Sequence, residues 1–159
     1  MSFWKKNNPD STSPNNDKPR SRTQLAITAS RTLTRLGLGT FMTIAGTSHL
    51  TFARDEFQAQ VPNWVPLDTD FVVISSGVAE IGLGLSTLLL PKQRLWTGTA
   101  LALFYVAIFP GNISQYVNAV DAFGLDTDAK RFGRLFFQPV LIGLSLWSAG
   151  LPRIGHKKN

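Results

Sequence analysis

The segment 71–91 reads FVVISSGVAEIGLGLSTLLLP and contains one charged residue, Glu80. About 20 mostly apolar residues are enough for a helix to cross the hydrocarbon core of a bilayer. Three other stretches, 36–53, 95–120 and 135–152, contain no Asp, Glu, Lys or Arg, although the chain of 159 residues has 26 of them. A soluble domain carries charge on the outer side of its helices. The pattern therefore predicts an integral membrane protein and argues against a soluble enzyme or a nucleic-acid binder.

These stretches predict an all-α fold, a four-helix membrane bundle that occupies residues 31–150. The expected spans are residues 33–52, 71–90, 95–113 and 132–149. Residues 1–30 are polar and basic, and we expect a disordered tail there, because such a composition buries too little apolar surface to offset the entropy of ordering. This tail does not resemble a signal peptide, since the first apolar run comes late and is long enough to span. Residues 151–159 are expected to form a basic C-terminal tail.

The basic residues predict the orientation of the bundle. With the N-terminus in the cytoplasm, 12 Lys and Arg residues fall on the inner side and four on the outer side. Lys and Arg are enriched in cytoplasmic loops, so both termini are expected in the cytoplasm. We interpret the net charge of +6 as a sign of this topology and of attraction to anionic membrane lipids. No folded basic face for a nucleic-acid partner is expected.

Five polar residues lie inside or at the ends of the expected spans: His49, Glu80, Asn112, Arg134 and Gln138. A charged side chain at the bilayer centre costs roughly 2.5–3.5 kcal/mol on translocon scales, so these residues should face one another. The helical rise places His49 roughly 5 Å and Glu80 roughly 13 Å below the outer edge of the membrane, Asn112 and Arg134 near that edge, and Gln138 one turn deeper than Arg134. We therefore predict a polar pocket in the outer half of the membrane, in which Glu80 leans outward toward His49.

Small residues and a proline shape the helices around this pocket. Gly77 and Gly84 share a face of the second span with Glu80, and small residues allow membrane helices to approach closely. Pro110 lacks an N–H and, together with Gly111, is expected to form a helix break near the outer end of the third span. The chain has no cysteine and no metal-ligating pattern, so no metal site is expected.

Two interpretations of the five polar residues stay open. In the functional one they form a binding or proton-handling pocket, with Glu80 as an acid or base beside His49. In the structural one they only fix the order of the helices. The two are balanced for Glu80 and His49, whereas the structural interpretation is favoured for Asn112 and Gln138, because amides commonly join membrane helices. Arg134 is interpreted as an anchor at the membrane interface.

The same residues carry a resemblance to a known family. The motifs are, in chain order, Gly46-Thr47-Ser48-His49 with Phe57, Val61-Pro62 and Pro66, then Ser76-Gly77 with Glu80, the basic turn Pro91 to Arg94, Phe109-Pro110-Gly111-Asn112-Ile113, and finally Arg134, Gln138 and Trp147. In this order and spacing they resemble the DoxX-like family of small membrane proteins over residues 31–149. Gly111 stands where that family usually has alanine, and the tail of residues 1–30 is not part of the pattern.

The resemblance implies a multi-pass protein of the bacterial inner membrane. Relatives in that family include a subunit of a thiosulfate:quinone oxidoreductase and proteins linked to methylamine dehydrogenase maturation and oxidative stress. We expect an accessory or scaffold subunit rather than an enzyme, without a resident cofactor, whose pocket binds a lipid, a quinone or a partner helix. The alternative is a subunit of a quinone-linked oxidoreductase in which Glu80 and His49 transfer protons and a redox partner supplies the electrons. A transporter is disfavoured because the sequence shows no inverted repeat.

Overall fold

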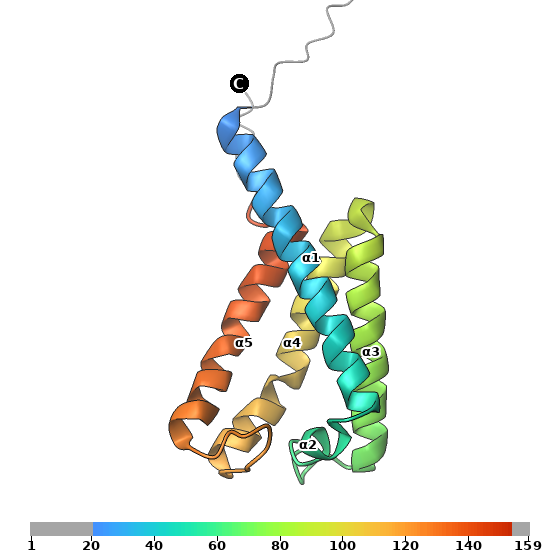
Figure 1. The fold of residues 1–159 in the computed structure, drawn as a ribbon, viewed down its shortest axis with the longest axis vertical. Coiled ribbons are helices and arrows are strands. Elements are labelled where there is room, and N and C mark those ends of the chain that lie inside the picture. The colour runs from blue at the N-terminus through green and yellow to red at the C-terminus, as the bar shows by residue number, and fades with distance from the viewer. Residues whose placement is uncertain (1–20, 154–159) are drawn as a thin grey trace, which may run out of the picture.

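The computed structural model of the protein describes residues 21–153 (Figure 1). The elements, in chain order, are α1 (Arg22–Leu50), α2 (Arg54–Gln58), α3 (Thr69–Leu89), the 3-10 helix η1 (Pro91–Gln93), α4 (Arg94–Val117) and α5 (Asp128–Ala149). All regular structure between residues 21 and 153 is thus helical, and the predicted all-α fold is confirmed over that range.

The first helix begins inside the predicted disordered tail of residues 1–30, so that boundary is corrected. The Ser21 hydroxyl accepts a hydrogen bond from the Gln24 N–H, and the Gln24 side chain accepts one from the Ser21 N–H. This capping box starts a helix in a polar segment, and the helix then continues into the apolar one. Residues 1–20, and residues 154–159 of the predicted C-terminal tail, lie outside the described part of the chain.

Two helical segments are long and apolar enough to cross a membrane, Thr69–Leu89 and Pro91–Val117. They coincide with the second and third predicted spans. In each segment only 28% of the most apolar window is buried inside the protein, whereas the central helix of a soluble domain is buried on most sides. The other two long helices, α1 and α5, cover the first and fourth predicted spans and carry charged residues near one end.

The four long helices form two tightly packed pairs. The helix α1 packs along α3, and α4 packs along α5, while the pairs meet through α1 with α5 and α3 with α4 (Figure 1). A Cβ on Gly46 would stand 2.5 Å from the Gly77 carbonyl oxygen, and one on Gly84 would stand 2.8 Å from the Gly39 carbonyl oxygen. Backbones that approach this closely exclude any larger residue at the contact. The predicted face of Gly77 and Gly84 therefore meets α1.

Both described ends of the chain lie toward one end of the bundle, which we call the terminal end (Figure 1). The short helix α2 and the connection between α4 and α5, residues 118–127, lie at the opposite end, which we call the loop end. The long helices therefore alternate in direction along the bundle axis.

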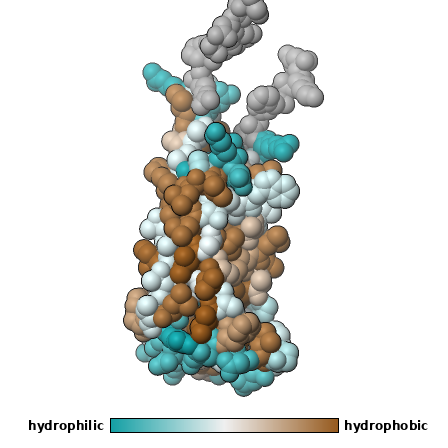
Figure 2. Space-filling model, turned by 90° about the vertical axis from the view of Figure 1, so that its right-hand side faces the viewer, coloured by the Kyte–Doolittle hydropathy of each residue, from teal (hydrophilic) through white to brown (hydrophobic). Residues whose placement is uncertain are grey.

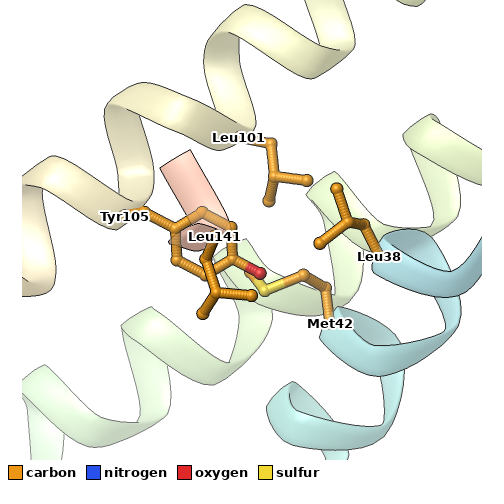
Figure 3. Packing of buried hydrophobic residues seen from close by; sticks show 5 residues of the cluster. All are labelled: Leu38, Met42, Leu101, Tyr105 and Leu141. Atoms are coloured by element: carbon orange, nitrogen blue, oxygen red, sulfur yellow. The ribbon is translucent and has the colours of Figure 1, made fainter. Parts of the chain in front are cut away.

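The two pairs share a core of buried apolar side chains, shown in Figure 3, from α1, α4 and α5: Leu38, Met42, Leu101, Tyr105 and Leu141. Met42 is 1% exposed and Leu101 is fully buried. The Tyr105 ring points from α4 toward the thioether of Met42 on α1 (Figure 3). This contact joins side chains from both helix pairs and holds the pairs together near the middle of the bundle. The space between the pairs toward the loop end is lined by other residues.

Candidate functional site

A cavity of about 470 Å³ lies between the two helix pairs, on the loop-end side of the apolar core. Its walls come from all four long helices, from α2 and from the loops at the loop end. All five polar residues singled out in the sequence line this cavity: His49, Glu80, Asn112, Arg134 and Gln138. The structure thus brings into one place residues that are up to 89 positions apart in the chain.

His49 and Glu80 form the polar wall between α1 and α3. The His49 Nε2 atom lies 3.6 Å from the Glu80 Oε2 atom, and the two residues are only 5% and 4% exposed. The other ring nitrogen, Nδ1, lies 3.0 Å from the Ser76 hydroxyl oxygen, which fixes the orientation of the imidazole. At this separation the imidazole and the carboxyl are close neighbours without a hydrogen bond, and a small approach would bring them within proton-transfer distance.

Two buried polar atoms at this site have no hydrogen-bond partner in the part of the chain that the structure describes, residues 21–153. They are the Glu80 Oε2 atom and the Tyr105 hydroxyl, and both residues line the cavity. Leaving such a group unsatisfied costs on the order of 1–3 kcal/mol. A carboxyl oxygen and a phenol that face one cavity offer hydrogen-bonding capacity to an occupant. Tyr105 was not predicted from the sequence, because a tyrosine inside an apolar span has no distinguishing pattern.

Asn112 and Gln138 connect α4 to α5. The Asn112 amide donates to the Gln138 side-chain oxygen at 2.9 Å, and the Gln138 amide donates to the Tyr105 carbonyl oxygen at 2.7 Å. Both residues are buried, and every bond in this chain joins one helix to the other. The geometry agrees with the structural interpretation of these two amides.

The predicted helix break at Pro110 and Gly111 is wrong, because α4 continues through both residues to Val117. A proline removes one backbone hydrogen bond without ending a helix when other contacts hold that turn. Here the Gln138 side chain binds the carbonyl of Tyr105 in the turn before the proline. Gly111 faces the loop end, where a Cβ would meet the Gln60 carbonyl oxygen at 3.4 Å.

Three residues cover the cavity toward the loop end: Phe57, Gln60 and Phe123, which we call the cap. The Phe57 ring lies against the His49 ring at 3.4 Å between centroids, with the two planes tilted by 43°, and meets the Phe123 ring edge-on at 4.6 Å. The Phe123 N–H donates to the Glu56 carboxylate at 2.6 Å. The loops on either side of the bundle are therefore joined above the cavity. Phe57 belongs to the family-like pattern, whereas nothing in the sequence marks Gln60 or Phe123.

Arg134 joins the cap to the helices. Its guanidinium donates to the Gln60 side-chain oxygen at 2.8 Å and lies 5.0 Å from the centre of the Phe123 ring. The Gln60 amide in turn donates to the Gln115 side-chain oxygen at 3.2 Å. The sequence indicated an interfacial anchor at Arg134, but the half-buried side chain is directed toward Gln60 and Phe123 in the cap.

Ion pairs tie down the loops at the loop end. Arg131, whose side chain is 6% exposed, contacts both Asp121 and Asp128. Lys130 pairs with Asp126 at 2.7 Å, and this hydrogen bond lowers the pKa of Asp126 below its usual value. Asp121, Asp126 and Asp128 therefore each have a basic partner.

A second tie joins α2 to the start of α3. Arg54 binds the Asp70 carboxylate, which also accepts a hydrogen bond from the Gln58 amide at 2.7 Å. This contact raises the pKa of Arg54 above its usual value. It holds α2, and with it Phe57, over the cavity.

Fold and site together define an all-helical protein with two candidate membrane helices and a largely apolar cavity edged by buried polar groups. Within residues 21–153 no group of three His, Cys, Asp or Glu side chains could hold a metal ion. The chain belongs to the family described as domain of unknown function DUF8561, whose model matches residues 38–149. This range contains all five polar cavity residues. No curated protein and no solved structure matched the chain.

Proposed function

We propose that this chain is a multi-pass inner-membrane protein in which all four long helices cross the bilayer, with the loop end outside and both termini in the cytoplasm. The surface supports this proposal, because hydrophobic residues cover the middle of the bundle and hydrophilic ones gather toward its ends (Figure 2). Large apolar side chains on all four helices are more than half exposed, among them Ile44, Val78, Leu103 and Phe136. Exposed apolar area on this scale is unusual for a soluble monomer and ordinary for a protein surrounded by lipid.

The charges on α1 and α5 are compatible with membrane insertion. The α1 arginines lie near the terminal end, where Arg35 donates to the carbonyl oxygens of Thr87 and Leu88 at 2.7 and 2.9 Å. On α5, Lys130 and Arg131 are paired with acidic residues at the loop end. From Leu135 to Ala149 the same helix has no charged residue. Charges held at the ends of a span are tolerated because they reach the headgroup region.

The proposed role of the cavity is to bind a lipid-like molecule that enters from the bilayer. The cap residues line the cavity at the loop end, and Phe41 on α1 and Phe137 on α5 also line it and are 50% and 52% exposed. Exposed apolar side chains beside the cavity favour access from lipid. The observation that carries the proposal is that two buried groups, the Glu80 Oε2 atom and the Tyr105 hydroxyl, have no hydrogen-bond partner among the described residues and line this largely apolar cavity.

In this proposal the protein is a non-catalytic accessory or scaffold subunit, and its occupant is a membrane lipid, a quinone or a helix of a partner protein. The occupant would present a small hydrogen-bonding head to Glu80 and Tyr105 and an apolar body to the helices. The resemblance to the DoxX-like family agrees with this role and stays a prediction.

The contact of His49 with Glu80 supports a second candidate function, a subunit of a quinone-linked oxidoreductase. Reduction of a quinone takes up protons as well as electrons, and a carboxyl 3.6 Å from an imidazole could deliver them. The chain has no cysteine and no cofactor-binding motif, so a partner subunit would carry the electrons.

The two candidates are separated by what accompanies the protein. We would purify the full chain in mild detergent, extract it with organic solvent and identify small molecules and partner proteins by mass spectrometry. A bound lipid without a redox subunit supports the accessory role, whereas a quinone together with a redox subunit supports the oxidoreductase.

A matched pair of variants tests whether the occupant sits in this cavity. Ala107 lines the cavity, and Ala100 lies two turns earlier on the same face of α4 without lining it. Ala107→Phe should reduce the amount of bound molecule several-fold, and Ala100→Phe should leave it unchanged. Equal amounts in both variants would contradict binding in the cavity.

A further inference from the structure

Arginines converge at the terminal end of the bundle, far from the cavity described above. Arg31 reaches this place from α1, Arg94 from the start of α4, and Arg153 from the segment after α5. Together with Leu95, Ala149, Gly150 and Leu151 they line a hollow of about 500 Å³. Nothing in the proposed function uses this hollow.

The guanidinium groups of Arg31 and Arg94 approach a single point. If Gly150 had a Cβ, that atom would stand 3.7 Å from Arg31 Nη1, 3.8 Å from Arg94 Nε and 3.9 Å from Arg94 Nη2. Two cations held this close repel each other unless an anion lies between them. Glycine at position 150, with φ of +97°, keeps the space between the two groups free of a side chain.

No carboxylate in residues 21–153 forms an ion pair with either arginine. The acidic residues of that range lie at the loop end, apart from Glu80 in the cavity. One Arg31 donor is used, because Nη2 donates to the Pro152 carbonyl oxygen at 2.7 Å and the guanidinium lies over the Trp147 ring. The buried Arg31 Nε has no hydrogen-bond partner among residues 21–153. Donors at two guanidiniums therefore stay available.

We propose that Arg31 and Arg94 bind the phosphate group of an anionic phospholipid beside Gly150. Arginine presents planar, paired N–H donors that match the spacing of phosphate oxygens, and two such groups can hold one phosphate from two sides. The apolar neighbours Leu95 and Trp96 are 38% and 76% exposed, which offers a surface to the acyl chains. Inorganic phosphate in solution carries the same group as the lipid headgroup, so the experiment has to distinguish the two ligands.

The test measures lipid binding to the full-length chain in neutral detergent by native mass spectrometry. Phosphatidylglycerol should bind at least about tenfold more tightly than zwitterionic phosphatidylcholine, since a charge-assisted hydrogen bond is worth roughly 1.5–3 kcal/mol. Arg94→Gln should weaken phosphatidylglycerol binding by a similar factor, and Arg94→Lys should weaken it less. Arg94 is exposed and makes no side-chain hydrogen bond within the described residues, so its replacement should leave the fold intact.

Lys92→Gln is the matched control, because it removes one positive charge two residues from Arg94 and outside the hollow. Inorganic phosphate that displaces phosphatidylglycerol at millimolar concentration would identify a soluble phosphate as the ligand, and failure to displace it would identify the lipid. If Arg94→Gln weakens phosphatidylglycerol binding no more than Lys92→Gln does, the proposal is overturned.

Discussion

His49 on α1 and Glu80 on α3 are direct neighbours, with 3.6 Å between Nε2 and Oε2. The sequence places them roughly 8 Å apart in depth by helical rise, a gap that the side chains must bridge. The structure shows how this happens. The α1 and α3 backbones touch at Gly46 and Gly77, so that a Cβ on Gly77 would stand only 2.8 Å from the His49 Cβ. The predicted contact of the two residues is confirmed, and it rests on glycines that let the helices meet.

The first prediction is that His49 and Glu80 stabilise the protein together. Replacing either one by alanine leaves a buried polar group without its neighbour, which should lower the free energy of unfolding by about 1–3 kcal/mol. Glu80→Gln should cost less than Glu80→Ala, because the amide keeps the shape and one acceptor. The double variant His49→Ala with Glu80→Ala should cost less than the sum of the single ones.

Thermal unfolding in detergent measures this cycle. If the losses of the two single variants add up to that of the double variant, His49 and Glu80 have no coupling energy. Other contacts in the cavity would then hold Glu80 in place.

The second prediction concerns the contact of α1 with α3. Gly46→Ala should destabilise the protein by about 1–3 kcal/mol, because the new methyl group would overlap the Gly77 backbone. Gly37→Ala, on the same helix, meets nothing within 4 Å and should be neutral or stabilising by up to about 1 kcal/mol through helix propensity. Unfolding curves of the two variants in the same detergent give the comparison. Similar values for both would mean that the helices separate easily at Gly46.

The third prediction is the topology. Single cysteines can be introduced at Ser2, Ala59, Ala129 and Asn159 in a chain that has none. A membrane-impermeant thiol reagent applied to intact cells should label Ala59→Cys and Ala129→Cys, which are exposed positions at the loop end. It should label the other two only after the cells are opened. Labelling of either terminal position in intact cells would exclude the proposed orientation.

The fourth prediction addresses the cap. Phe57→Ala removes the ring between His49 and Phe123 and should lower stability by about 1–3 kcal/mol, less than the ~3–5 kcal/mol of a fully buried phenylalanine. It should also accelerate loss of the co-purified molecule during washing in detergent. Phe52→Ala is the control, because that ring is 84% exposed. Unchanged retention in Phe57→Ala would mean that the occupant does not depend on the cap.

The two middle long helices could be predicted closely from the chain because each is a long and mostly apolar run. The predicted spans 71–90 and 95–113 agree with Thr69–Leu89 and Arg94–Val117, since an apolar run of this length with at most one charged residue has few alternatives to a helix. The helix boundaries were less predictable. Pro110 looks like a break in the sequence, yet α4 continues past it to Val117, and the Gln138 side chain of α5 binds the Tyr105 carbonyl one turn earlier.

The amino-acid sequence by itself determined the helices and the polar residues that have to face inward, because buried polar side chains in an apolar span need partners. Only the tertiary structure decided which partners they have. It turned Arg134 toward Gln60, joined Asn112 to Gln138, and placed Phe123 over the cavity. These choices depend on the relative height and rotation of helices far apart in the chain. Close packing at glycines and contacts between the loops fix that geometry, and no local sequence pattern predicts it.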